Sequence, residues 1–368
     1  MKRLWKFTKY TLLTIVALIL VVLGGAWFAS PGETPAFVSE TGEALPQSIA
    51  KIERVEIGGL EQFIIIRGRD RTNPALLVLH GGPGTSETAM FRHFNAALED
   101  HFTVVHWDQR GAGNSFSDTL TPESMTVDRM VSDTHELTQY IKAELGQDKI
   151  YLLGHSWGSF LGAITTSRYP EDYIAYIGTG QISNQLESEN LAYDFVLNAA
   201  RQAGDDDAIT VLEDLGPLEI SGKSDSEILD WVFAQRPYIA QYEQVENAMN
   251  PMVMMFQPLL AADEFTLGEK FGFFSGTFFS LNSLFPQVLA TDLNEEAPRF
   301  DIPVFFLQGA GDLATAEPLA RAYFDRIEAP EKQYILFEKS GHNPPFEEPE
   351  LFNRTMIETI LGSASPLD

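Results

Sequence analysis

The chain has 368 residues, more than one small core needs, which is consistent with one large domain plus an insertion. Hydrophobic residues make up 44% of it, which argues against global disorder. The formal net charge of −27 at pH 7 argues against nucleic acid and anionic lipid headgroups as partners, and the absence of cysteine excludes disulfides, thiol catalysis and cysteine zinc sites.

The N-terminal region differs in kind from the rest of the chain. An uncharged run over residues 11–29 would measure about 28 Å as a helix, enough to span a bilayer. It follows four basic residues, Lys2, Arg3, Lys6 and Lys9. We favour a retained single-pass membrane anchor, because the run is long for a signal peptide; the alternative is a signal peptide cut near residues 24–26, giving a secreted or periplasmic protein. Positive charge before the run places the remaining chain on the extracytoplasmic side.

Short apolar runs then alternate with helical patterns, which is typical of a mostly parallel sheet flanked by helices. Residues 30–50 are rich in Pro, Gly, Ser and Glu and read as a linker. We expect strands at 53–57, 62–67, 75–79, 102–107, 150–153, 173–177, 304–307 and 333–337. We expect helices at 87–99, 126–145, 318–327 and 349–361, and one between residue 158 and Pro170.

The alternation stops over residues 181–299, where helix-like segments predict a helical cap inserted into the α/β core. Its Phe-rich run at 271–285 indicates cap core more readily than a substrate pocket. The predicted division of the chain is a transmembrane segment at 1–29, a linker at 30–50, core at 51–180, cap at 181–299 and core again at 300–368.

The sequence Gly154-His155-Ser156-Trp157-Gly158 stands between a buried strand and a helix. This is the pattern of a nucleophile elbow, in which a sharp turn lifts a serine hydroxyl clear of the backbone. The flanking chains pass too closely for side chains at positions 154 and 158. We therefore predict Ser156 as the nucleophile; the alternative is a glycine-rich turn whose serine only caps the helix.

A serine hydroxyl needs a base, and the base needs an acid that orients it. In this architecture both follow later strands in the order serine, acid, histidine. Asp312 follows the strand at 304–307 and His342 follows the strand at 333–337, so we predict both for these roles. Asp292 and Asp301 are rival acids, but each precedes its strand.

An oxyanion needs two preorganised backbone donors. We expect the N–H of Trp157 and that of Gly82, with Gly81 as the second choice for the latter. His155 is expected to point away from the turn, and His80 to brace its loop. No pair of histidines has metal-ligand spacing, so we predict no metal and no cofactor.

Three motifs now carry a resemblance: HGGPG at 80–84, WDQRGAGNS at 107–115 and GHSWGS at 154–159. The chain resembles α/β-hydrolases of the proline iminopeptidase-like group of serine peptidases, best over 53–180 and 298–368. The resemblance implies an α/β-hydrolase fold, the triad Ser156, Asp312 and His342, and an oxyanion hole at Gly82 and Trp157. It also implies that Asp108 and Arg110 form a structural pair.

The resemblance is poorest in the cap, where such peptidases hold the free N-terminus of the substrate with glutamates. Candidate substrate-binding residues, chosen by type and position alone, are Gln181, Glu187, Glu189, Glu243 and Glu246. The leading hypothesis is an aminopeptidase that releases an N-terminal residue from short peptides through an acyl-enzyme. Alternatives are an esterase, lipase-like or lactonase activity on an apolar ester, and a non-catalytic binding module on the same scaffold. The sequence does not indicate an oligomeric state.

Overall fold

A computed structural model of the chain describes residues 9–12, 14–15, 24–27, 29–243 and 245–363. Much of the predicted membrane segment at 1–29, namely residues 1–8, 13, 16–23 and 28, lies outside these residues. Within the described part, no helix is both long and apolar enough to cross a membrane. The anchor and the extracytoplasmic location therefore stay predictions from sequence.

The core is one eight-stranded sheet in the order β1-β2-β4-β3-β5-β6-β7-β8. The bounds of the strands are β1 Ile49–Ile57, β2 Leu60–Gly68, β3 Ala75–Leu79, β4 Thr103–Trp107, β5 Ile150–His155, β6 Tyr173–Thr179, β7 Val304–Gly309 and β8 Lys332–Phe337. Only β1 with β2 and β2 with β4 pair antiparallel; the pairs from β4 to β8 are parallel. This is the mostly parallel sheet that the alternation of patterns predicts.

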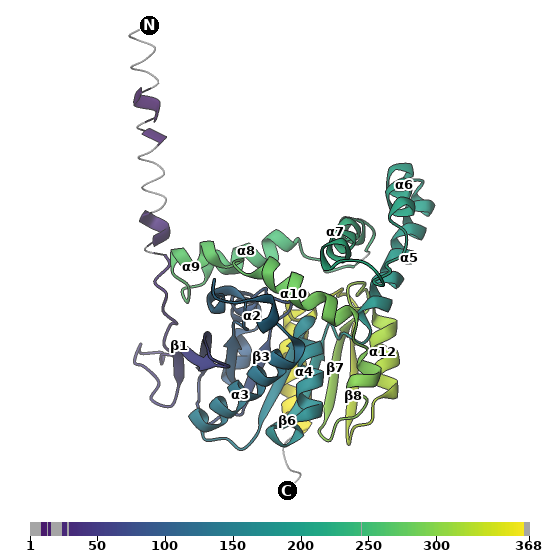
Figure 1. Ribbon diagram of the computed structural model, residues 1–368. Helices are drawn as coiled ribbons and strands as arrows, with labels where there is room; N and C mark the ends of the chain where they lie inside the picture. Colours follow the sequence, from purple (N-terminus) through teal and green to yellow (C-terminus); the bar gives the residue numbers. More distant parts are fainter. Residues whose placement is uncertain (1–8, 13, 16–23, 28, 244, 364–368) are drawn as a thin grey trace.

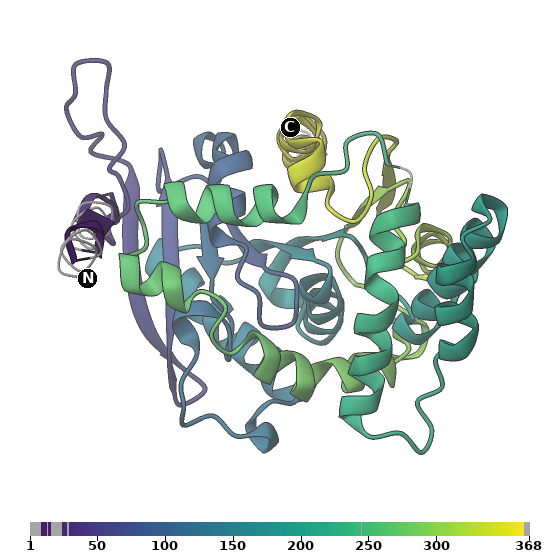
Figure 2. The ribbon, with the colours of Figure 1, turned by 90° about the horizontal axis from the view of Figure 1, so that it is seen from above.

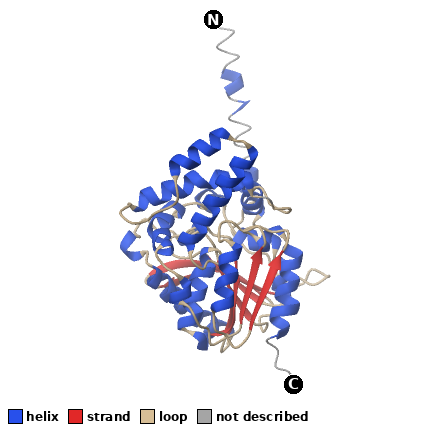
Figure 3. Ribbon diagram, turned by 90° about the vertical axis from the view of Figure 1, so that its right-hand side faces the viewer, coloured by secondary structure: helices blue, strands red, loops and turns tan. Residues whose placement is uncertain are grey.

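Helices cover both faces of the sheet (Figure 3). One face packs against α3 (Val127–Leu145), α4 (Trp157–Arg168) and α12 (Glu317–Arg326), and the other against α2 (Thr88–Phe94) and α14 (Pro349–Arg354). Strands β3 and β5 are therefore buried along their whole length, which explains why they read as continuous apolar runs. The predicted helix α3 has its expected ends, with Thr126 accepting a hydrogen bond from the N–H of Arg129 and Gly146 in the left-handed conformation.

Between β6 and β7 the chain forms helices that lie over the carboxyl ends of the strands (Figures 1 and 2). Their bounds are α5 Gln185–Ala203, α6 Asp206–Leu215, α7 Asp225–Tyr242, α8 Pro251–Ala261, α9 Leu267–Gly272, α10 Thr277–Leu289 and α11 Leu293–Glu296. Helices α5, α6 and α7 share a small apolar core of their own. The Phe-rich run at 271–285 is only partly buried. Phe273 and Phe285 are buried, whereas Phe271 and Phe278 are 76% and 68% exposed.

Helix α10 fastens the cap to the loops beneath it. The hydroxyl of Thr277 donates to the carbonyl of Gly84 at 2.9 Å, and the hydroxyl of Ser280 donates to the carbonyl of Gly111 at 2.8 Å. A Cβ placed on Gly84 would lie 2.5 Å from the Cβ of Ser280. The helix therefore rests directly on the backbone of the HGGPG loop.

The turn between β5 and α4 is one of the tightest points of the fold. Ser156 has φ 53° and ψ −119°, and it is the single non-glycine residue with positive φ in the described part of the chain. A Cβ on Gly154 would lie 2.2 Å from the carbonyl oxygen of Gly158, and one on Gly158 would lie 2.0 Å from that of Leu79. Both positions therefore exclude any side chain, since the atoms they would meet belong to the backbone.

Replacing Gly158 by Ala is expected to lower the free energy of unfolding by about 3 kcal/mol or more, the upper range for overpacking, because backbone cannot yield as a side chain can. The matched control is Gly268→Ala on α9, where nothing lies nearer than 4.0 Å and the change should stay below about 1 kcal/mol. Urea unfolding followed by circular dichroism measures both. Equal stability of the two variants would contradict this account of the turn.

Candidate active site

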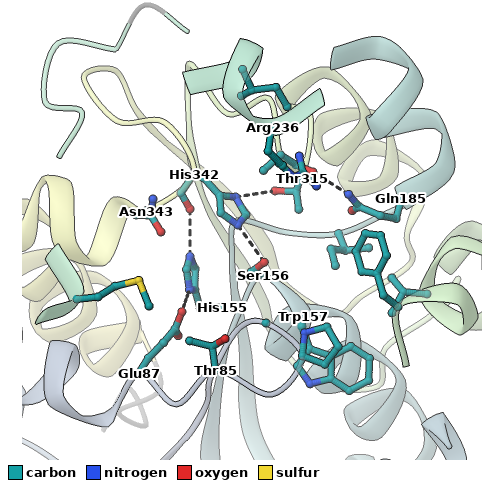
Figure 4. A pocket seen from close by; sticks show the side chains of 18 of the residues that line it. Thr85, Glu87, His155, Ser156, Trp157, Gln185, Arg236, Thr315, His342 and Asn343 are labelled. Atoms are coloured by element: carbon teal, nitrogen blue, oxygen red, sulfur yellow. Dashed lines mark hydrogen bonds and ion pairs between the residues drawn. The ribbon is translucent and has the colours of Figure 1, made fainter. Parts of the chain in front are cut away.

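Three side chains from three separate loops form one line of hydrogen bonds, of which Figure 4 shows the contact between His342 and Ser156. The Nε2 atom of His342 lies 2.9 Å from the Oγ of Ser156. Its Nδ1 atom lies 3.0 Å from Oδ2 and 3.1 Å from Oδ1 of Asp312. The structure thus brings together the three residues that the sequence predicts as nucleophile, base and acid, in the geometry that proton transfer from the hydroxyl requires.

The carboxylate of Asp312 is fully enclosed, and each of its oxygens has more than one donor. Its Oδ1 accepts from the N–H groups of Ala314 and Thr315, and its Oδ2 from the Thr315 hydroxyl and the Gln308 amide. Burial alone would raise the pKa of Asp312, but His342 and these hydrogen bonds outweigh it and hold the pKa below its ordinary value. Asp312 is therefore ionised at neutral pH and fixes which nitrogen of His342 carries the proton.

The two rival acids lie elsewhere. Asp292 caps α11 by accepting from the N–H of Asn294, and Asp301 pairs with Arg299 at the surface. Neither carboxylate has His342 among its hydrogen-bond partners in the described residues.

The loop carrying Gly82 is braced from below by the WDQR segment. The N–H of Gln109 donates to Nε2 of His80, so the ring proton is on Nδ1 and is donated to the carbonyl of Gly81 at 2.8 Å. Burial lowers the pKa of His80, which keeps this neutral form. The side chain of Gln109 accepts from the indole N–H of Trp157 at 2.8 Å and so ties the loop to the elbow. Gly82 and Trp157 both line the cavity beside Ser156.

His155 is placed differently from the expectation that it points away from the turn. It lines the cavity, its Nδ1 lies 2.8 Å from the Glu87 carboxylate, and its Nε2 lies 3.0 Å from the carbonyl of His342. Both partners accept, so both ring nitrogens carry protons. Burial would lower the pKa of His155, but Glu87 and the His342 carbonyl outweigh it and raise that pKa. A buried ion pair therefore holds the backbone of the loop that carries His342.

The expected pair of Asp108 with Arg110 is not formed. Asp108 accepts from the hydroxyl of Ser86 and the N–H of Asn114, whereas Arg110 binds Asp133 at 2.6 Å. Both residues are buried and structural, but each has its own partner, because Asp108 faces the loop of Ser86 whereas Arg110 reaches Asp133 on α3.

A cavity of about 400 Å³ opens over Ser156. Its lining mixes apolar side chains from the cap with a few charged ones. The apolar residues include Ile182, Ile239, Met254, Met255, Phe285 and Val288, and the charged residues are Glu87, Arg236 and Glu243. No cluster of His, Asp or Glu that could hold a metal ion occurs in the described part of the chain.

Of the five residues considered for substrate binding, only Glu243 lines this cavity. Glu187 is exposed on α5, and Glu246 is exposed and pairs with Lys339 at 2.6 Å. Glu189 is buried beneath the cavity wall, where it binds Arg236. Gln181 is fully buried and turns to Tyr176, whose hydroxyl donates to it at 2.7 Å.

Sequence reasoning missed Glu87, Gln185 and Arg236 as lining residues. Glu87 stands three residues after the HGGPG motif, and its nearness to that motif was a usable signal. Arg236 had only the weak signal of being one of the few cations in the acidic cap segment, and Gln185 had none.

The comparisons with known proteins concern the family and the fold of the chain. Residues 74–207 match the family model described as the alpha/beta hydrolase fold. The probable aminopeptidase YbaC of Bacillus subtilis (strain 168) is 32% identical over 310 residues, covering 84% of this chain and 96% of the relative. The proline iminopeptidase of Clostridioides difficile (strain 630) is 26% identical over 287 residues, covering 77% and 89%.

Among solved structures, the proline iminopeptidase-related protein TTHA1809 of Thermus thermophilus shares the fold, with a TM-score of 0.60 at 21% identity over 85% of this chain and 98% of that one. The fold, the three converging side chains and these relatives lead to one assignment. The chain belongs to the α/β-hydrolase family, within its proline iminopeptidase-like group, and is a hydrolase.

Proposed function

We propose that this hydrolase is a serine aminopeptidase that releases the N-terminal residue of short peptides through an acyl-enzyme. The observation that carries the proposal is the line of hydrogen bonds from Ser156 through His342 to Asp312 at the floor of a cavity whose wall holds an acidic side chain, Glu243. The names of the aminopeptidase relatives support the same substrate class.

In this mechanism the Oγ of Ser156 attacks the scissile carbonyl carbon while Nε2 of His342 takes its proton. The N–H groups of Gly82 and Trp157 stabilise the oxyanion. His342 then gives the proton to the leaving amine, and the peptide bond breaks. Water deacylates the enzyme by the same steps, and Asp312 stabilises the imidazolium each time.

Glu243 is the residue that we assign to the free amine of the substrate. It follows the last residue of α7, and a Cβ placed on Gly341 would lie 2.9 Å from its Oε1, so its carboxyl group lies directly beside the His342 loop. Burial and the neighbouring charge of Asp312 raise the pKa of Glu243 to about 7. An ammonium group bound here relieves both effects, because it supplies the missing opposite charge.

An apolar ester is the second candidate substrate, because most of the cap side chains in the cavity wall are aliphatic or aromatic. The triad serves esters and amides alike. The two candidates differ in whether the enzyme requires a free amine.

Replacing Ser156 by Ala is expected to lower kcat by about 10⁶, which leaves only oxyanion and binding effects. Asp312→Asn is expected to lower kcat by about 10⁴ with the fold intact, because His342 then carries its proton on the wrong nitrogen. Turnover of a prolyl amide by purified variants measures both. Full activity of Ser156→Ala, or an Asp292→Asn variant with the larger loss, would reject these assignments.

N-acetylation of a prolyl amide substrate is expected to lower kcat/KM by at least about 100-fold, since removing one buried charge pair costs about 3 kcal/mol or more. In Glu243→Gln the two substrates should differ far less. Glu187→Gln, which changes an exposed carboxylate outside the cavity, is the matched control. Equal rates for the free and acetylated substrates in the unsubstituted enzyme would favour the esterase.

The raised pKa of Glu243 also predicts how stability varies with pH. Its carboxyl group binds a proton more tightly in the folded protein, with a pKa of about 7, than at its ordinary value of 4.5. Its contribution to stability is thus complete below pH 4.5, falls as pH rises and is lost above pH 7. Glu243→Gln cannot ionise, so it should gain stability relative to the unsubstituted protein between about pH 5 and pH 8 in urea unfolding. A stability difference that does not change with pH would contradict the assigned pKa.

A further inference from the structure

We infer that α7 and the residue after it bind both ends of a short peptide. Glu243 holds the amine of the peptide, and Arg236 holds its free carboxylate. The substrate class is then a peptide with both termini free, and a dipeptide in the first place. This inference rests on the proposed aminopeptidase function and adds to it a carboxylate subsite.

One face of α7 provides the two charged ends. Arg236 and Ile239 of α7 and Glu243, which directly follows its last residue, all line the cavity, and their spacing of three and four residues places them in one row. At about 1.5 Å per residue, Arg236 and Glu243 are about 10.5 Å apart along the axis. The row therefore presents a cation, an apolar side chain and an anion to one cavity.

The guanidinium of Arg236 is held in place by one ion pair, and its Nη1 has no hydrogen-bond partner among the described residues. Its Nη2 donates to Oε1 of Glu189 at 2.5 Å, and Glu189 is itself fully buried. The Nη1 atom is buried as well. A guanidinium has five N–H donors in a fixed plane, suited to a two-point grip on a carboxylate. The ion pair with Glu189 thus orients Arg236 and leaves it donors for a ligand.

Gln185 lies beside Arg236 (Figure 4), and both side chains donate to Oε1 of Glu189. Its Nε2 donates to Glu189 and to the carbonyl of Ala314, while its Oε1 has no partner among the described residues. The residue is only 3% exposed and lines the cavity. An unmatched donor and an unmatched acceptor thus lie side by side at this end, and a leaving amino acid offers a carboxylate to the one and an N–H to the other.

The length of the row selects the length of the peptide. An extended dipeptide spans about 7 Å between its charged ends, and each further residue adds about 3.3 Å. With one charge-assisted hydrogen bond of about 2.8 Å at each end, a dipeptide needs about 12.6 Å, about 2 Å more than the axial separation of Arg236 and Glu243, and side chains of this length can take up that difference. A tripeptide needs about 16 Å and exceeds the same separation by about 5 Å.

The test compares three substrates with the same N-terminal residue: prolyl-alanine, its C-terminal amide, and prolyl-alanyl-alanine. We expect kcat/KM for the dipeptide to exceed that for the amide at least tenfold, mainly through KM, and to exceed that for the tripeptide as well. In Arg236→Met the ratio of dipeptide to amide should fall toward one. The control is Arg201→Met, an exposed arginine of α5 paired with Glu213, which should leave the ratio unchanged.

The comparison of substrates needs no variant, so poor folding of Arg236→Met does not remove the test. Equal rates for dipeptide and amide, or a preference for the tripeptide, would overturn the subsite while leaving the aminopeptidase assignment intact. An equal loss on all substrates in Arg236→Met would show a purely structural arginine and also overturn it. Hydrolysis of esters with no turnover of any prolyl amide would reject the proposed function and the subsite together.

Discussion

The strained turn at Ser156 is the constraint on which the rest of the site depends. Its positive φ persists because the backbone of β5, α4 and the end of β3 meet within contact distance at Gly154 and Gly158. Because the backbone segments pack this closely, Ser156 cannot relax to an unstrained backbone conformation. The turn therefore fixes one hydroxyl in space, and the other groups of the site are positioned around it by loops from later parts of the chain.

A second set of interactions fixes the loops to the turn. His155, next to the serine in sequence, is hydrogen-bonded to the backbone of the histidine loop, and Glu87 keeps His155 charged. On the other side Gln109 joins Trp157 to the loop of His80. The relative positions of nucleophile, base and expected oxyanion donors are thus set by buried polar contacts, which cost free energy unless all are formed together. Such a network favours a single arrangement of the site.

Much of the core was predictable from sequence, because local rules decide it. The G-x-S-x-G pattern between a strand and a helix, and the acid and histidine after later strands, follow from topology alone. The cap residues were not predictable in this way. Which glutamate reaches the cavity depends on how α5 and α7 pack, so Glu189 turned inward to Arg236 while Glu243 faced the site. The prediction that Gln181 binds substrate was wrong for a similar reason, because its side chain accepts a hydrogen bond from the hydroxyl of Tyr176 instead.

The contact of α10 with the HGGPG loop limits how the protein can open. Thr277 and Ser280 are bonded to backbone carbonyls beside Gly82 and the WDQR segment, with no space between helix and loop. A cap that lifted at this point would pull the neighbourhood of the expected oxyanion donors with it. Because α10 is bonded to these loops, it forms a fixed side of the entrance above Ser156.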